Sequence, residues 1–431
     1  MTTELKSTKP LSGFVELLPA QQRFMDDCVA RMRGVLKNAG FEYLDLPAVE
    51  RAEVLTDAED FEDTATEMYL FQKGETKMGL RYDGTVGLAR YVAGHLNDLA
   101  FPFRATQYSK RYRGERPQKY RYREFYQLDM DIMGVGRLST NYDAELIAVW
   151  EQVYSVIPEL VGRYTIRIGS RRFWNAVFDW MGFDDDARRA ALVLIDKQKK
   201  MPGDEFLAGL ATVFRENADL INSVFTIGYS VLLNCDVNID AAIAELDDFG
   251  KLLECSGVKN FQIDVAIVRG LGYYTGLVYE AVSDDYPELG SIGGGGQYEN
   301  LVGKFSKTKI AGVGLAIGIN RVVAMAIDSG RIDWSKYETP ADVAVLVIGQ
   351  QQAAYAINVL NELRGAGVVA VPYLDTDKKF KNQIEFADKI GSRFSVIIGE
   401  DEVSSEMLTV KNMTSGDQQK LALADVIKLV K

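Results

Sequence analysis

The sequence contains a single histidine, His95, in 431 residues. A Ser/His/Asp triad, a multi-histidine metal site and a histidine proton shuttle all require imidazole side chains, so most of this chemistry is excluded. The pattern RYVAGHL around His95 predicts a packed or half-exposed helical residue. Any catalysis must therefore use arginine, carboxylate, tyrosine, glutamine or backbone groups.

Cysteines and long apolar runs are also scarce. The three cysteines, Cys28, Cys235 and Cys255, lie far apart without a CxxC spacing, which argues against a disulfide framework and a zinc site. No run of eighteen apolar residues occurs, so we expect no membrane-spanning segment. Residues 1–6 contain no apolar signal segment, and we therefore expect a cytoplasmic protein.

The net charge of −12 argues against non-specific binding to nucleic acid, although a local basic surface remains compatible with it. The chain is long enough for two or three domains, and its 47% hydrophobic content suits an ordinary globular protein. Residues 171–256 read as mostly helical, between stretches that alternate as strands do. After a boundary near residues 338–340, strands and helices alternate, which predicts a small α/β domain with a largely parallel sheet.

A basic stripe interrupts this acidic sequence at YSKRYRGERPQKYRYREFYQLDMDIMG, residues 108–134. Charged and apolar residues alternate over 104–134, which predicts long antiparallel strands. Against Glu115 alone stand Arg104, Lys110, Arg111, Arg113, Arg116, Lys119, Arg121 and Arg123. Because side chains alternate across a strand, one face would carry Arg121, Arg123, Phe125, Gln127, Asp129 and Asp131.

Two interpretations of this polar face remain open. It is either a solvated outer surface with salt bridges, or the floor of a cleft. In the second case arginines bind phosphate, Phe125 stacks on a base, and Gln127 with Asp131 recognise a polar substrate.

Two glycine-rich stretches follow. Arg269, in IVRGLGYYTGLVYEAV (267–282), lies among apolar residues and glycines, which suits either an anion ligand or a snorkelling side chain. Four glycines at 293–296 permit close backbone approach to a ligand, or simply form a flexible turn. GVGLAIGINR (312–321) predicts a strand that enters a helix carrying Arg321.

Taken in order, these segments resemble the histidyl-tRNA synthetases, a family of class II aminoacyl-tRNA synthetases. FEYLDLPAVE (41–50), RGERPQKYRYREFYQLDMDIMG (113–134) and GVGLAIGINR are similar to the three class II motifs. VRGLGYYTGLVYE (268–280) and GGGGQYENLVG (293–303) are similar to the two histidine-specific motifs, and LRYDGT (80–85) to the segment that holds the substrate's amino group. LRGAGV, KNQIEFADKIG and SVIIGEDE resemble the family's anticodon-binding domain.

The resemblance implies an α+β fold, with an antiparallel-sheet catalytic domain at residues 1–338 and a helical insertion at about 171–256. A small α/β anticodon-binding domain would follow at residues 339–431. The implied activity is ATP-dependent formation of histidyl-adenylate and transfer of histidine to its tRNA. Mg²⁺ is expected with ATP, with no all-protein metal site. The family's first motif places Pro47 at a dimer interface, so a homodimer is expected.

The resemblance also implies residue roles. Arg113 would bind the α-phosphate of ATP, Arg321 the far phosphates, and Phe125 would stack under adenine. Arg269 would lie beside the carboxylate and the α-phosphate, and Arg113, Arg269 and Gln127 would be the catalytic group. The histidine-binding residues would be Asp83, Thr85 and Gln127 at the amino and carboxylate end, and Asp131, Tyr274 and Tyr298 around the imidazole.

The sequence departs from the family at five of these motif positions. The family's aspartate and arginine are replaced by Gly272 and Gln297, which suggests that a charge pair was removed in two linked changes. The family's usual aspartate, glutamate and glycine are here Glu299, Asn320 and Tyr120.

Two other functions compete with tRNA charging. One is a catalytically idle paralogue that senses histidine, as the regulatory subunit of ATP phosphoribosyltransferase does; the other is a related ligase or tRNA-binding module with a different substrate. The first typically lacks an anticodon domain, and residues 341–431 argue against it. That segment has ten Lys and Arg against twelve Asp and Glu, so tRNA contact would depend on local clusters such as Lys378, Lys379 and Lys381, unless these merely form a solvated helix start.

Overall fold

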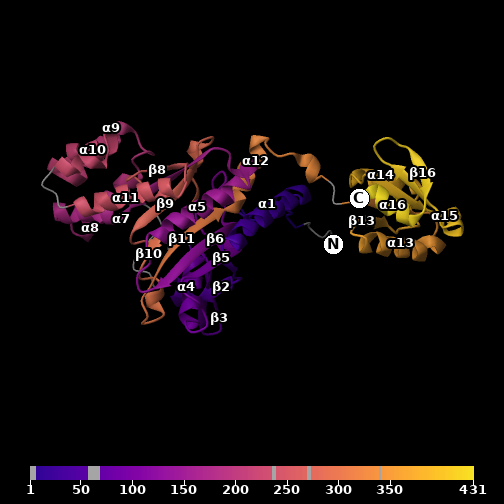
Figure 1. The fold of residues 1–431 in the computed structure, drawn as a ribbon, viewed down its shortest axis with the longest axis horizontal. Helices are drawn as coiled ribbons and strands as arrows, with labels where there is room; N and C mark the ends of the chain where they lie inside the picture. The colour runs from indigo at the N-terminus through magenta and orange to yellow at the C-terminus, as the bar shows by residue number, and fades with distance from the viewer. Residues whose placement is uncertain (1–5, 57–67, 235–238, 269–272, 339–340) are drawn as a thin grey trace. The chain divides into compact units, whose positions relative to one another are not determined.

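The computed structural model describes residues 6–56, 68–234, 239–268, 273–338 and 341–431. The chain divides into two compact units, one of residues 1–16 and 25–332 and one of residues 17–24 and 333–431 (Figure 1). Within the described ranges, no helix is both long and apolar enough to cross a membrane.

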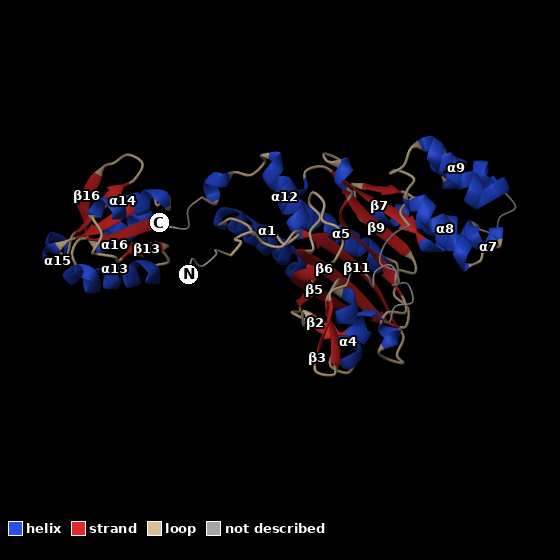
Figure 2. Ribbon diagram, turned by 180° about the vertical axis from the view of Figure 1, so that it is seen from behind, coloured by secondary structure: helices blue, strands red, loops and turns tan. Residues whose placement is uncertain are grey.

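An eight-stranded sheet forms the centre of the first unit (Figure 2). Neighbouring strands are antiparallel except at the two edges, where β1 pairs with β5 and β7 with β8 in parallel. In spatial order the strands are β1 (Glu42–Tyr43), β5 (Phe103–Tyr112), β6 (Glu124–Val135), β11 (Ile310–Gly318), β10 (Ser291–Tyr298), β9 (Leu277–Ser283), β7 (Tyr164–Ser170) and β8 (Phe261–Ile263). The predicted fold class, α+β with an antiparallel sheet, is confirmed.

The β5–β6 pair comes from the basic stripe. Its register runs from Phe103 opposite Met133 to Tyr112 opposite Glu124. Leu128, Met130 and Ile132 of β6 are fully buried, as the alternation predicts. The prediction of strand is wrong for residues 113–123, which connect β5 to β6. Pro117 lies in this loop, and a proline cannot donate a hydrogen bond to a ladder.

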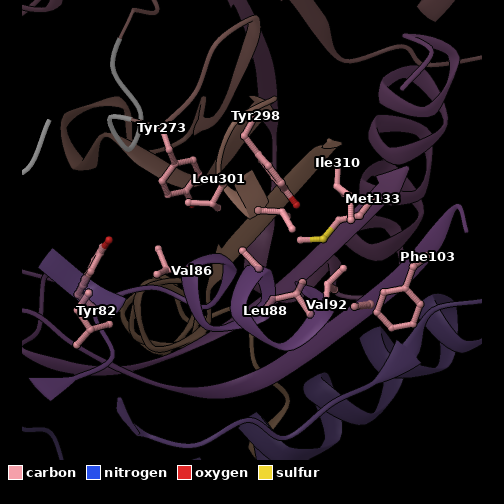
Figure 3. Packing of buried hydrophobic residues seen from close by; sticks show 14 of the residues in the cluster. Tyr82, Val86, Leu88, Val92, Phe103, Met133, Tyr273, Tyr298, Leu301 and Ile310 are labelled. Carbon is pink, nitrogen blue, oxygen red and sulfur yellow. The ribbon is translucent and has the colours of Figure 1, made fainter. Parts of the chain in front are cut away.

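Helices cover the sheet with apolar faces of helical spacing. Figure 3 shows α4 (Thr85–Gly94) packing Val86, Leu88 and Val92 into a cluster with Met133 of β6 and Tyr298 of β10. Further helices outside the insertion include α1 (Pro19–Asn38), α5 (Asn141–Ser155), α6 (Pro158–Val161) and α12 (Ile319–Ser329). The turn before α4 therefore lies directly against the sheet.

A small second sheet leads into that turn. It consists of β2 (Val49–Arg51), β4 (Thr76–Leu80) and β3 (Leu70–Lys73), with α2 (Ala52–Thr56) between β2 and β3 in the chain. Arg81 after β4 donates hydrogen bonds to the carbonyls of Leu46 and Lys110, at 2.5 and 2.8 Å. This fixes the backbone that carries Asp83 into α4.

The predicted helical segment 171–256 lies at the β7–β8 end of the sheet in both views of the fold (Figures 1 and 2). Its helices enclose a core of stacked aromatic rings, among them Trp174, Phe178 and Phe225. They are α7 (Arg171–Met181), α8 (Asp185–Asp196), α9 (Gly203–Phe214), α10 (Ala218–Thr226) and α11 (Asp240–Cys255). Short 3₁₀ turns in the chain are η1 (Arg215–Asn217), η2 (Tyr229–Asn234), η3 (Pro287–Leu289), η4 (Val302–Lys304), η5 (Trp334–Lys336) and η6 (Gln350–Gln352).

The second unit contains a five-stranded sheet between helices. Its strand order is β13 (Ala370–Tyr373), β12 (Val343–Val347), β14 (Phe394–Ile398), β15 (Leu408–Asn412) and β16 (Gln418–Leu421). The first three strands are parallel, as strand–helix alternation predicts, whereas β15 and β16 add an antiparallel edge. The helices are α13 (Ala353–Gly365), α14 (Phe380–Lys389), α15 (Glu400–Ser405) and α16 (Leu423–Val430).

Candidate active site

A cleft lies over strands β6, β10 and β11, as two adjoining cavities of about 260 and 560 Å³. Arg113, Gln127 and Gly294 line both cavities, so the two form one continuous site. Glycines make the floor because backbones approach closely there. Gly295 of β10 stands opposite Leu315, and a Cβ atom at residue 295 would overlap the carbonyl of Gly314. The glycine run is therefore strand with close backbone approach, not a flexible turn.

The smaller cavity brings together an aromatic ring and two guanidinium groups. Arg113, Phe125 and Arg321 all line it. The Arg113 guanidinium carbon lies 5.3 Å from the Phe125 ring centroid, and its Nε donates to the carbonyl of Tyr82 at 3.2 Å. The hydrogen bond to Tyr82 holds the Nε side of the Arg113 guanidinium at the edge of the two cavities that Arg113 lines.

Arg321 is held from two sides. Its Nη1 donates to the Ser291 carbonyl and its Nε to the Tyr120 carbonyl at 3.3 Å. Burial lowers the pKa of Arg321 to about 10, with Arg121 and Arg113 adding repulsion. A group of mutually repelling cations at a partly buried site favours an anionic ligand.

The larger cavity is acidic and phenolic. Four of the six predicted histidine-binding residues line it: Asp83, Thr85, Gln127 and Tyr274. Asp83 accepts hydrogen bonds from the Tyr273 hydroxyl at 2.6 Å and from the Val86 N–H at 2.9 Å. These two bonds fix the carboxylate at the start of α4, where an acidic side chain is favourable.

Asp131 and Tyr298 are buried and line neither cavity of the cleft. The Tyr298 hydroxyl donates to Asp131 Oδ1 at 2.8 Å, and Thr85 Oγ1 donates to the same oxygen at 3.4 Å. Burial raises the pKa of Asp131 well above its usual range, and the neighbouring Asp129 adds to that rise. Arg269 and Gly272 fall outside the described residues, so their predicted roles stay predictions.

Three residues of this site were not among the predicted catalytic and binding residues. Asp129 lines the larger cavity and pairs with Arg111, whose side chain is fully buried. Tyr273 orients Asp83. Strand alternation placed Asp129 on the same face as Gln127 and Asp131, and this shared face was the sequence signal that could have identified Asp129 as a site residue. Nothing in the sequence showed that Arg111 turns inward from a stripe of otherwise exposed or half-buried cations.

The structure shows the surroundings of two residues that depart from the family pattern. The backbone of Tyr120 has φ of 60°, a left-handed conformation that favours glycine. The Tyr120 hydroxyl donates a hydrogen bond to Asp328, a contact that a glycine could not make. The Asn320 side-chain oxygen accepts a hydrogen bond from the Tyr126 N–H at 2.6 Å. A neutral amide oxygen is sufficient for this contact, so a carboxylate is not required.

Gln297 is explained by a neighbour on another element. Its Oε1 accepts hydrogen bonds from Arg172 of α7 at 2.8 Å and from the Leu277 N–H at 3.0 Å. A cation is therefore already present beside position 297, and an arginine there would face Arg172. This accounts for a neutral residue at 297 without reference to Gly272. The Glu299 Oε1 atom lies 3.4 Å from Nη2 of the same Arg172 guanidinium.

Asp143 on α5 provides a pH test of this buried network. It accepts hydrogen bonds from Tyr279 at 2.5 Å and from Gln297, yet burial raises its pKa to about 6. Its folded-state pKa exceeds the unfolded value of about 3.9, so its contribution to stability is present at low pH and lost as pH rises through about 6. Between pH 5 and pH 8 the free energy of unfolding of the wild type should fall by about 1.4 kcal/mol relative to Asp143→Asn. Urea unfolding of both proteins at the two pH values measures this, and a constant difference would contradict it.

Comparison with known proteins adds to this geometry. A family model described as Histidyl-tRNA synthetase matches residues 13–322, and one described as Anticodon binding domain matches residues 342–431. A protein from Clostridium tetani named Histidine--tRNA ligase is 36% identical over 445 residues, covering 100% of both chains.

Solved structures show the same fold. The histidyl-tRNA synthetase of Nostoc sp. PCC 7120 has a TM-score of 0.78 and 30% identity, with 99% of each chain covered. A Bacillus halodurans protein named as an ATP phosphoribosyltransferase regulatory subunit/histidyl-tRNA synthetase has a TM-score of 0.74 over 92% of this chain and 99% of its own. Its 18% identity shows a shared fold alone.

Proposed function

Because the chain belongs to the histidyl-tRNA synthetase family, we propose that it activates histidine with ATP and transfers it to histidine tRNA. The observation that carries the proposal is the division of one cleft into two ends. Arg321 and Phe125 line only the smaller cavity, whereas Asp83, Thr85 and Tyr274 line only the larger one. A nucleoside triphosphate and a zwitterionic amino acid would then meet at Arg113 and Gln127, which belong to both ends.

The chemistry needs no general base. The substrate carboxylate is already ionised at neutral pH and attacks the α-phosphorus of ATP, forming histidyl-adenylate and releasing pyrophosphate. Two anionic groups must approach, and charge then builds on the non-bridging oxygens. Preorganised guanidinium groups offset the repulsion and stabilise that charge, while the cleft positions the reactants. This is compatible with a chain that has one histidine.

We assign the residue roles from the family resemblance and from the place of each residue in the cleft. Arg113 would bind the α-phosphate, Arg321 the far phosphates, and Phe125 the adenine, with Arg269 beside the reacting groups. Asp83, Thr85 and Gln127 would hold the amino and carboxylate groups of histidine. Tyr274 would meet the imidazole, while Asp131 and Tyr298 would support that side of the pocket from behind.

Mg²⁺ would enter with ATP as part of the substrate. Among the residues that the structure describes, no group of three or more His, Cys, Asp or Glu could hold a metal ion. Glu115 and Glu280 line the cleft beside the arginines, and carboxylate oxygens are ligands that Mg²⁺ prefers. The two glutamates fit an ion bound mainly to phosphate oxygens, where it would neutralise part of the triphosphate charge.

ATP–pyrophosphate exchange, run with each amino acid in turn, tests the proposal. Exchange that requires histidine supports it. Exchange with another amino acid would indicate a related ligase instead. No exchange, together with measurable histidine binding, would indicate a histidine-sensing regulatory subunit.

We assign residues 1–338 to the catalytic domain, with the insertion at about 171–256, and residues 339–431 to anticodon binding. The active form would be a homodimer in the cytoplasm. Sedimentation at several protein concentrations tests the dimer. In the anticodon-binding domain, Lys378, Lys379 and Lys381 are exposed at the start of α14. Lys381 pairs with Glu385 one turn along the helix, at 3.6 Å, whereas Lys378 and Lys379 precede the helix, where cations oppose its dipole and suit an anionic partner.

Replacing these three lysines with alanine should weaken tRNA binding several-fold and reduce its salt dependence by about two to three in the log–log slope. Histidine-dependent exchange should change less than about twofold, since only the tRNA contact is removed. Filter binding of tRNA at several salt concentrations measures the first effect. The control replaces Lys420, Lys428 and Lys431, three exposed lysines elsewhere in the unit. Equal loss of binding in the control, or equal loss of exchange, would contradict the assignment.

A further inference from the structure

We propose that Tyr120 is a positioning residue for the nucleotide: its hydroxyl, bonded to Asp328 of α12, holds the 113–123 loop at the smaller cavity before ATP binds. This rests on the proposed function, because it concerns the ATP end of the same cleft. The family pattern has a glycine at this position, so the contact is a property of this chain.

The 113–123 loop forms one wall of the smaller cavity. Its residues that line the cavity are Arg113, Glu115, Tyr120, Arg121 and Tyr122. Residues 118 and 121 exchange two backbone hydrogen bonds, at 3.2 and 3.0 Å, so the loop reverses in a tight turn whose tip is residues 119–120. The place of this turn therefore decides how the arginines of the loop face a ligand.

Three polar contacts join the turn to α12. The Tyr120 carbonyl accepts a hydrogen bond from Arg321 Nε at 3.3 Å, in the first turn of the helix. The Tyr120 hydroxyl donates to Asp328 Oδ2, and Lys119 Nζ lies 3.5 Å from the same oxygen. Asp328 follows Arg321 by about two helical turns, so both lie on one side of the helix. The turn is therefore fixed at two separate points along α12.

Neither partner of the hydroxyl contact is favoured by its own place in the backbone. Tyr120 has φ of 60°, where a tyrosine is strained and a glycine is not. Asp328 lies in the last turn of α12, where the helix dipole disfavours an acidic side chain. Positions where local preferences are violated concentrate at functional sites. The contact that joins these two residues beside the cleft accounts for both.

A loop that is already in place lowers the cost of binding ATP. A ligand that must order a loop loses the ordering free energy from its binding free energy. Here Arg321 is held from both sides, by the Tyr120 carbonyl and by the Ser291 carbonyl, before any ligand is present. Tyr120 lines the smaller cavity and not the larger one. Its hydroxyl should therefore affect the affinity for ATP and leave that for histidine unchanged.

Calorimetric titration of ATP with Mg²⁺ into the full-length protein tests the proposal. Tyr120→Phe keeps the ring and removes the hydroxyl. It should weaken ATP binding about three- to tenfold, the lower range for a hydrogen bond to a charged group, because Asp328 is 52% exposed. Histidine binding should stay within about twofold. A smaller loss of ATP affinity, or an equal loss for histidine, would overturn the proposal.

Variants of the acceptor separate this contact from a general effect on folding. Asp328→Ala should weaken ATP binding as much as Tyr120→Phe does, and the double variant no more than either single one. Asp328→Asn keeps an acceptor oxygen, so its ATP affinity should lie closer to that of the wild type. The matched control is Tyr142→Phe, the same change at a half-buried tyrosine of α5 that lines neither cavity. Additive losses, or a similar loss in the control, would contradict the contact.

Digestion with trypsin in the absence of ligands tests the position of the loop directly. Trypsin cleaves after Lys119 and Arg121, and its rate reports the fraction of open loop. Cleavage at these two sites should be about three- to tenfold faster in Tyr120→Phe and Asp328→Ala than in the wild type. Unchanged cleavage would overturn the proposal.

Exchange kinetics separate positioning from a merely structural role. In Tyr120→Phe the KM for ATP should rise while kcat stays within about twofold, because only the ordering of the loop changes. A fall in kcat without a change in KM would contradict positioning. Faster cleavage and weaker ATP binding without histidine-dependent exchange would refute the proposed function and leave this inference standing. Normal exchange with unchanged cleavage and ATP affinity in Tyr120→Phe would refute the inference alone.

Discussion

Replacing Arg113 with lysine is expected to slow histidine-dependent ATP–pyrophosphate exchange by about two to three orders of magnitude. Arg113 lines both parts of the cleft, where the α-phosphate and the substrate carboxylate would meet. Loss of one preorganised donor to a developing oxyanion costs about 10²- to 10³-fold in rate. Lysine keeps the charge, but it has neither the planar fork nor the Nε that bonds to the Tyr82 carbonyl.

The rate constant should fall more than the Michaelis constants change, because the contact strengthens as charge develops. Arg116→Lys is the matched control. Arg116 is an exposed cation in the same loop and lines neither cavity of the cleft. Its replacement should change the rate less than about twofold. A loss below tenfold for Arg113→Lys, or similar losses in both variants, would contradict the role of Arg113.

Replacing Arg111 with methionine should destabilise the first unit by about 3–5 kcal/mol, the range found when one partner of a buried ion pair is removed. The Arg111 side chain is fully buried and Asp129 is 5% exposed, so the remaining carboxylate would be left without its cation. Three of the four tryptophans, Trp150, Trp174 and Trp180, lie in this unit. Urea unfolding followed by tryptophan fluorescence therefore measures the change.

The double variant Arg111→Met with Asp129→Ala supplies the control. It removes both charges, so it should lie within about 2 kcal/mol of the wild type, and the two single effects should not add. Additive effects would show that the two side chains do not form one unit. A cost below 1 kcal/mol for Arg111→Met alone would show that Asp129 does not depend on the pair.

Much of the fold could be predicted from local patterns. Apolar spacing placed the helical insertion, and alternation placed β5 and β6, because these elements bury one face at a fixed period. The error at residues 113–123 arose because charged and apolar residues also alternate in a loop, where Pro117 interrupts the ladder. The antiparallel edge of the second sheet was missed, since pairing direction depends on contacts distant in sequence.

The sequence by itself determined the kind of chemistry: one histidine excluded imidazole catalysis, and the motif order pointed to the family. The resemblance also grouped Arg113, Phe125 and Arg321 as the expected ATP-binding residues, because they stand at the family's motif positions. Only the tertiary structure decided which of the two aspartates at the end of the β6 polar face lines the larger cavity. Asp129 and Asp131 share a strand face and differ by two positions, so no sequence pattern separates them. The difference comes from Arg111, which pairs with Asp129, and from Tyr298 and Thr85, which donate hydrogen bonds to Asp131 from two further elements.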